Sequence, residues 1–191
     1  MSTRIRFSTA ADVFAAFPQL EFIVARPSAD APPLDYAQAL GASPRPLDGL
    51  AFLAHLLPRR EAIWWGCQCV SAILGPTAND EGLSLALRWV RDPEETTRRE
   101  ALSFSQASAL RTPTSWLARA VGYSGGSIVA PDQPVTPPPP EACAQAVNAA
   151  AVLAATAEPA PAVLPWMRAF VEAGIRFAAG QEARVAPPVN R

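Results

Sequence analysis

The positions of the prolines limit the folds open to this chain more than any other feature of its sequence. There are 21 prolines among 191 residues. Between these breaks, apolar residues recur with the period of a helix, and we find no convincing alternation of apolar and polar residues. Because proline opens or ends a helix but disrupts its interior, this spacing predicts many short helices. The expected fold class is all-α, a compact bundle of about eight short helices.

The expected helices are separated by turns that contain proline or glycine. Thr9 caps the first helix, which Pro18 ends. Pro58 marks a boundary, because it ends one helix and opens the next. The predicted helices span residues 10–17, 34–40, 48–57, 58–74, 95–110, 114–121, 141–157 and 162–179. A further helix is predicted to end at residue 91.

Two helices in the middle of the chain carry start signals. Thr77 or Asn79 is expected to cap the helix that ends at residue 91. The next helix starts after Asp92-Pro93-Glu94-Glu95, where Asp92 can cap free N–H groups and two acids face the positive end of the helix dipole.

Later boundaries are marked by threonine and glycine. Thr112 before Pro113 is a second cap-then-proline signal. Gly122 is expected to end its helix in the left-handed conformation, and Gly180 is expected to follow the last helix as a C-cap.

Residues 58–74 predict a helix that is apolar nearly all round. Only Glu61, Gln68 and Ser71 form a thin polar stripe along it. A helix of this kind is usually buried on every side. We therefore expect residues 62–74 to be the central element of the bundle.

The chain is expected to hold one all-α domain, residues 47–180, with less regular structure at both ends. Residues 1–46 contain a short helix and a proline-rich segment that we interpret as partly irregular. The tail, residues 181–191, is predicted to be disordered.

Charge and composition argue against several functions. The net charge of −1 gives no electrostatic footprint for nucleic acid or for an anionic membrane. The most apolar uncharged run, residues 142–157, is shorter than the about 20 residues that a membrane span needs. The N-terminus shows no secretory signal. We expect a cytoplasmic protein that binds neither nucleic acid nor membrane.

Metals and cofactors are not expected either. Cys67 and Cys69 are too close in sequence for an ordinary disulfide and lie in an apolar helix. With one histidine, His55, and one further cysteine, a zinc site lacks ligands. We interpret the cysteines as buried free thiols.

The pentapeptide GYSGG, residues 122–126, fits the G-x-S-x-G pattern of a serine-hydrolase nucleophile elbow. An elbow needs a strand before the serine and a helix after it, whereas a helical period precedes Ser124 and prolines follow it. His55 lies upstream of Ser124, which is not the order of that fold, and the chain has no lysine to act as a base. We therefore expect no catalytic residue, and a sharp turn at Gly125 and Gly126.

After this turn the chain becomes rich in proline, with polyproline character at residues 137–140. We name residues 124–140 the proline strap. The strap either lies across the bundle as a structural element or presents a surface that a partner reads, and the sequence leaves both alternatives open. The candidate partner-binding residues in it are Ser124, Gly125, Gly126, Ser127, Pro137 and Pro138.

Arg59, Arg60 and Glu61 are further candidates for a partner surface. The two arginines stand at a helix start, where the helix dipole disfavours cations. This conflict predicts nearby acidic partners from residues 92–95, or a ligand from outside. Arg98 and Arg99, by contrast, are expected to pair with Glu94 and Glu95 on a solvated helix face.

Three segments carry a resemblance to a known family: residues 58–65 (PRREAIWW), the stretch from Trp89 to Pro93, and the turn at residues 124–127 that runs into the strap. On these the chain resembles, over residues 47–180, a family of uncharacterised small proteobacterial proteins classed as a domain of unknown function. Its members are often encoded beside type VI secretion genes, and no catalytic residues are assigned to them.

The resemblance implies a non-enzymatic accessory role, as an adaptor or chaperone. The partner it implies is a protein, such as a secretion effector or a spike-associated component. The alternative is a small-molecule-binding or regulatory helical domain. That function would use a pocket beside Trp64, Trp65 and His55.

Overall fold

The structure, a computed structural model, describes residues 3–75, 80–109 and 111–188. In those residues it contains nine α-helices, one short 3-10 helix and no strand. The predicted all-α class is confirmed. The elements are α1 (Ala10–Ala16), η1 (Pro18–Phe22), α2 (Pro33–Ala42), α3 (Pro46–Leu56), α4 (Arg59–Leu74), α5 (Glu81–Arg91), α6 (Glu95–Ala107), α7 (Pro113–Gly122), α8 (Ala142–Thr156) and α9 (Ala160–Ala178).

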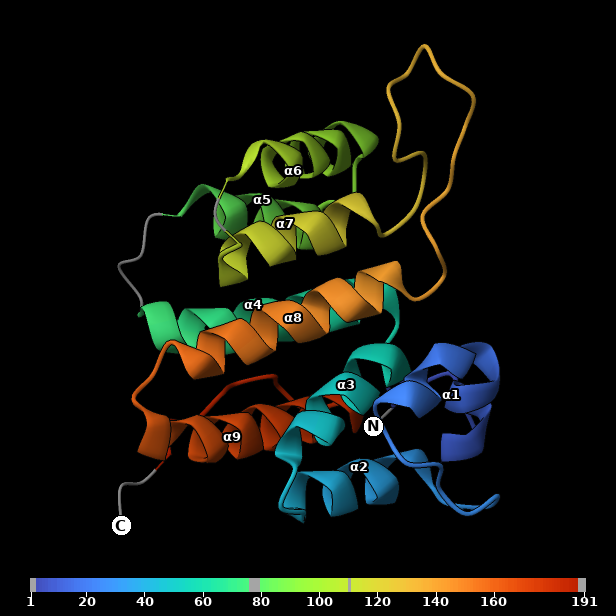
Figure 1. The fold of residues 1–191 in the computed structure, drawn as a ribbon, viewed down its shortest axis with the longest axis vertical. Coiled ribbons are helices and arrows are strands. Elements are labelled where there is room, and N and C mark those ends of the chain that lie inside the picture. The colour runs from blue at the N-terminus through green and yellow to red at the C-terminus, as the bar shows by residue number, and fades with distance from the viewer. Residues whose placement is uncertain (1–2, 76–79, 110, 189–191) are drawn as a thin grey trace.

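The helices are arranged in layers, with α4 and α8 side by side across the middle (Figure 1). Helices α5, α6 and α7 lie on one side of this pair, and α3, α9 and α2 lie on the other. The predicted central helix therefore shares the middle layer with α8. Close packing there depends on Gly66, since a Cβ atom at this position would lie 3.0 Å from Leu117 of α7 and 3.2 Å from Val147 of α8.

The N-terminal segment contributes to the same hydrophobic core. Phe14 of α1 stacks on Phe52 of α3, with ring centroids 6.1 Å apart, and Phe17 packs edge-on against His55 at 5.1 Å. Thr9 caps α1 as predicted, because its hydroxyl accepts a hydrogen bond from the backbone N–H of Asp12. Residues 24–32 are irregular. The elements before residue 47 thus close one side of the helical domain.

The start signals of α5 and α6 differ from the predictions. Asp80 caps α5 by accepting a hydrogen bond from the backbone N–H of Leu83, while the predicted caps, Thr77 and Asn79, lie outside the described residues. Asp92 does not cap α6, whose N-cap is Glu94 and makes no side-chain cap hydrogen bond. Asp92 instead follows α5, where its backbone N–H donates to the carbonyl of Arg88.

The threonine and one of the two glycine signals are confirmed. The hydroxyl of Thr112 accepts a hydrogen bond from the backbone N–H of Ser115 at the start of α7, and Gly180 has a φ of +95° after α9. Gly122 is not left-handed; the positive φ in this turn belongs to Gly126, at +63°. Gly122 is needed for packing instead, since a Cβ there would lie 2.8 Å from the Cβ of Leu102.

The N-terminal segment contacts the C-terminal end of α9. Arg4 donates hydrogen bonds to the carbonyls of Phe177 and Gln181, each 2.7 Å long, and its guanidinium lies over the Phe177 ring. After α9, Ala183 is buried, and the carbonyl of Arg184 accepts a hydrogen bond from Arg176. Ala183 and Arg184 therefore contact the body of the protein, while residues 182–188 form no regular secondary structure, and the disordered tail at residues 181–191 stays a prediction.

The remaining sequence predictions about the core concern cysteines and membrane spans. Cys67, Cys69 and Cys143 are free and buried, as predicted. Burial raises the pKa of Cys143 to about 12, and it raises the pKa values of Cys67 and Cys69 as well. Within the described ranges, no helix combines the length and the apolar character needed to cross a membrane.

Candidate functional site

The proline strap projects from the body of the protein between α7 and α8 (Figure 1). Residues 130–137 are all exposed, and Val135 keeps 80% of its surface open to solvent. Pro137 is exposed and Pro138 is half-buried. The outer part of the strap is therefore an accessible loop, whereas its base at Ser127 is buried.

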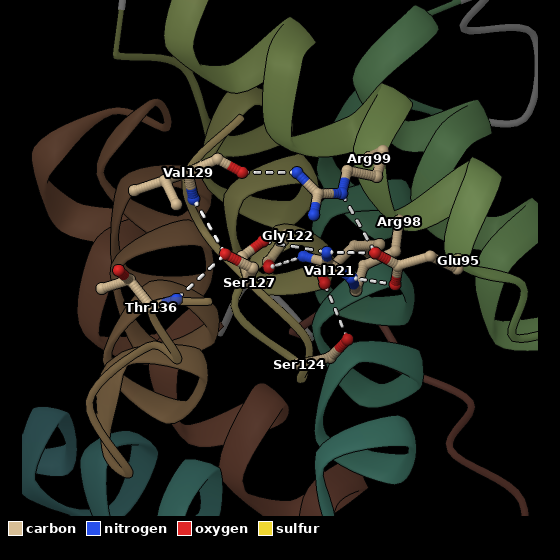
Figure 2. A network of polar contacts seen from close by, with 9 residues as sticks. All are labelled: Glu95, Arg98, Arg99, Val121, Gly122, Ser124, Ser127, Val129 and Thr136. Atoms are coloured by element: carbon tan, nitrogen blue, oxygen red, sulfur yellow. Dashed lines mark hydrogen bonds and ion pairs between the residues drawn. The ribbon is translucent and has the colours of Figure 1, made fainter. Parts of the chain in front are cut away.

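Arg98 of α6 holds the base of the strap (Figure 2). Its guanidinium donates to the carbonyl of Gly122 at 2.6 Å and to the carbonyl of Ser127 at 3.0 Å. Two further N–H groups bind the carboxylate of Glu95, both at 2.6 Å. The Arg98 side chain is only 4% exposed. The prediction that it lies on a solvated face is wrong, because α7 and the strap cover it.

Ser127 and Arg99 fix the first residues of the strap. The Ser127 hydroxyl accepts a hydrogen bond from the backbone N–H of Thr136 at 3.1 Å, and the N–H of Ile128 donates to the Thr136 carbonyl at 2.9 Å. Arg99 donates to the carbonyl of Val129 at 2.6 Å and to Glu95 at 3.0 Å (Figure 2). The two arms of the strap are thus joined near their base.

Arg59 connects the two ends of the strap. It donates to the carbonyl of Ser124 at 3.0 Å, and its other terminal nitrogen lies 3.5 Å from the carbonyl of Pro140. Arg60 points elsewhere and donates to the carbonyls of Val90 and Arg91 at the end of α5. The predicted acidic partners are therefore wrong: both arginines bind backbone carbonyls. For Arg60 this places a cation at the negative end of a helix dipole, where it is favourable.

Structural contacts account for Ser124 and Gly126 in the turn at residues 124–126. The Ser124 hydroxyl donates to the carbonyl of Val121 at 2.7 Å, and this carbonyl in the last turn of α7 also accepts the backbone N–H of Ser124 at 3.0 Å. Gly125 has open space around it, whereas a Cβ at Gly126 would lie 2.8 Å from Nη2 of Arg98. Gly126 therefore meets two requirements at once, a positive φ and a close approach to a buried guanidinium.

His55 is placed as a core residue. It is 3% exposed, and its Nδ1 lies 2.8 Å from the carbonyl of Ala51 one turn earlier in α3. Burial lowers the pKa of His55, so the neutral ring is favoured. The cavity that it lines with Arg59 and Pro140 has a volume of about 10 Å³, room for a water molecule at most.

Trp64, Trp65 and His55, the side chains expected to lie beside one ligand pocket, do not line a common cavity in the described residues. Trp65 is fully buried and donates its indole N–H to the carbonyl of Phe170 at 3.0 Å. Trp64 lines a shallow cleft of about 150 Å³ with Arg60 and Glu61, away from the His55 cavity. The structure thus brings Arg59 and residues 124–127 together at the strap base, while Arg60 and Glu61 belong to another surface.

The burial of Arg98 is the feature that the sequence interpretation missed, whereas the predicted pairing of Arg99 with Glu95 is confirmed by a 3.0 Å ion pair. The i, i+3 and i, i+4 spacing of the carboxylate to the two arginines was a visible signal. The acceptors that bury Arg98, the carbonyls of Gly122 and Ser127, are 24 and 29 residues away in sequence. Spacing along a helix carries no information on such contacts.

The same network predicts a pH dependence of stability. Hydrogen bonds from Arg98 and then from Arg99 lower the pKa of Glu95 to about 2, from 4.5. A lowered folded-state pKa gives stability that is present above the unfolded pKa and lost as the pH falls from about 4.5 towards 2. In Glu95→Gln we expect lower stability than wild type at pH 7 and a difference that shrinks over this window. Urea unfolding at several pH values measures it, and a constant difference would contradict the assignment.

The protein is thus a helical domain with a projecting loop, the proline strap, whose base is held by Arg59, Arg98 and Arg99. In the described parts of the chain, no group of His, Cys, Asp or Glu side chains could hold a metal ion. A family model matches residues 36–178, and the chain belongs to that family, a family of unknown function (DUF6931). The match begins within α2, earlier than residue 47. The comparisons with curated proteins and with solved structures give no match.

Proposed function

We propose that this protein is a non-enzymatic adaptor or chaperone that binds a protein partner through the outer part of the proline strap. The observation that supports this most is the contrast between a fixed base and an exposed outer loop. Arg59, Arg98 and Arg99 all bind strap carbonyls. Val135, in the loop between the bonded residues Ile128 and Thr136, remains 80% exposed.

A loop with a fixed base and an exposed outer part is suited to binding another protein. A loop whose base is already held loses less conformational entropy when a partner orders it. Proline residues keep the backbone extended and leave carbonyl oxygens without neighbouring N–H groups, which favours a partner that supplies hydrogen-bond donors. The strap carries one charged residue between Ile128 and Pro140, Asp132, so the contact is mainly apolar and backbone-mediated.

We take the class of partner from the resemblance to proteins that are encoded near type VI secretion genes. In this proposal the partner is a secretion effector or a spike-associated protein, held in the cytoplasm before delivery. The Ser124 hydroxyl supports a role without catalysis, since it is engaged by the Val121 carbonyl and His55 is buried in α3.

The test is a set of binding measurements with one strap variant. The variant carries Pro131→Gly, Pro134→Gly and Val135→Ser, three exposed positions in the loop between the bonded residues Ile128 and Thr136. We expect co-expressed effector or spike proteins from the same gene neighbourhood to bind the wild-type chain and to bind the variant about ten-fold more weakly, the loss of roughly one well-formed contact. The free energy of unfolding should fall by no more than about 2 kcal/mol, because each Pro→Gly substitution gives the unfolded chain more conformational freedom.

The matched control carries Pro44→Gly and Leu164→Ser, an exposed proline and an exposed leucine outside the strap. It should bind as wild type does. Equal binding by the strap variant would show that the strap is not the docking element, and failure of every neighbouring secretion protein to bind would contradict the proposed partner class. Arg59→Ala with Arg60→Ala is unsuitable, because both side chains hold this protein's own backbone.

A further inference from the structure

A cleft of about 410 Å³ is lined by residues of α2 and α9. These two helices lie at the end of the molecule opposite α6 (Figure 1). Its apolar floor includes Val171 and Ile175 of α9. Gly41 of α2 brings the two helices close, since a Cβ there would lie 2.6 Å from Cγ1 of Val171. The volume falls in the range of about 300–1,000 Å³ that is typical of small-molecule sites.

Two arginines of α9 also line this cleft. Arg168 and Arg176 are eight residues apart, so they lie on the same face of the helix, with Glu172 midway between them. The protein contacts of Arg168 are weak, since its Nη2 lies 3.4 Å from the carbonyl of Ser43. Arg176 donates to the carbonyl of Arg184 at 2.8 Å. A guanidinium has five N–H donors, so both side chains retain donors for a ligand.

We propose that this cleft binds a small amphipathic carboxylate. The aliphatic part of the ligand packs on Val171 and Ile175, and its carboxylate accepts hydrogen bonds from Arg168 or Arg176. Two guanidinium groups against one carboxylate, Glu172, give the cleft a positive balance, which selects an anion over a cation of the same shape. This site is separate from the strap, and the inference does not depend on the proposed adaptor function.

Three ligands of equal chain length test the proposal by isothermal titration of the full chain: decanoate, decanol and decyltrimethylammonium. We expect decanoate to bind more tightly than either of the others. Arg168→Ala with Arg176→Ala should weaken decanoate binding about ten-fold, the value of one charge-assisted hydrogen bond. Glu172→Gln should tighten it, because the substitution removes a like charge.

A steric variant and a remote control complete the experiment. Ala42→Trp fills the cleft from an exposed position and should abolish decanoate binding without unfolding the protein. Arg88→Ala, at an exposed arginine on α5, should bind decanoate as wild type does. Equal binding of decanol and decanoate, tighter binding of the cation, or no binding of any of the three ligands would overturn the proposal. So would weaker decanoate binding by Glu172→Gln.

Discussion

Arg98→Ala is expected to lower the free energy of unfolding by about 3–5 kcal/mol. The Arg98 side chain is 4% exposed, and its guanidinium donates to the carbonyls of Gly122 and Ser127. Alanine would leave both carbonyls without this donor, and each unsatisfied buried polar group costs about 1–3 kcal/mol. It would also leave a cavity below Gly126. Urea unfolding followed by circular dichroism gives the value.

Two further variants separate the causes of this loss. Arg98→Lys keeps the charge, but an ammonium group cannot bind two carbonyls and a carboxylate as the planar guanidinium does. Its free energy of unfolding should therefore lie between those of wild type and Arg98→Ala. Arg88→Ala removes an exposed ion pair with Glu100 and should cost less than about 1 kcal/mol. If Arg98→Ala proved as mild as Arg88→Ala, the strap would not be anchored by this side chain.

Trp65→Ala is expected to destabilise the protein by about 3–5 kcal/mol, the cost of a large cavity in a packed core. Trp65 is fully buried, and its indole N–H bonds to the carbonyl of Phe170, which links α4 to α9. Gly174 makes room for the ring, since a Cβ there would lie 3.0 Å from the indole nitrogen. The free energy of unfolding, from urea denaturation, measures the effect.

The neighbouring tryptophan provides the matched control. Trp64 is only half-buried, beside a shallow cleft, so Trp64→Ala should cost clearly less than Trp65→Ala. Trp65→Phe retains most of the ring volume but loses the hydrogen bond to Phe170, which is worth about 1 kcal/mol. Equal losses for Trp64→Ala and Trp65→Ala would contradict the assignment of Trp65 to the core.

The fold was largely predictable because its signals are local. Proline and threonine mark helix ends by constraints that act within one turn, and so the caps at Thr9 and Thr112 were predicted correctly. The all-round apolar segment likewise predicted a middle-layer helix. The partner of α4 in that layer was not predicted, because α8 is mostly alanine and its packing depends on close contacts such as that of Gly66 with Val147.

The site was predicted less well because its contacts join distant segments. Arg60 donates its hydrogen bonds to the carbonyls at the end of α5, 30 residues later in the chain, and not to the predicted acidic side chains. The sequence did not show which glycine of this turn adopts a positive φ, because either Gly122 or Gly126 could end a helix. In the structure Gly122 is required for close packing on Leu102. Gly126 has the positive φ and lies against Arg98. Arg59, Arg98 and Arg99 hold the strap by binding backbone carbonyls, and no sequence pattern indicates which carbonyls an arginine will bind.

The anchoring of both strap ends by Arg59 has a consequence for how this region can evolve. Because the carbonyls of Ser124 and Pro140 are held by one side chain, the span that the intervening chain must bridge is fixed by the body of the protein. The entropy cost of a longer loop between fixed ends grows only slowly, by about 0.6 kcal/mol for each doubling of its length. Insertions and deletions between residues 130 and 135, outside the bonded residues Ile128 and Thr136, should therefore be tolerated while the helical scaffold stays the same.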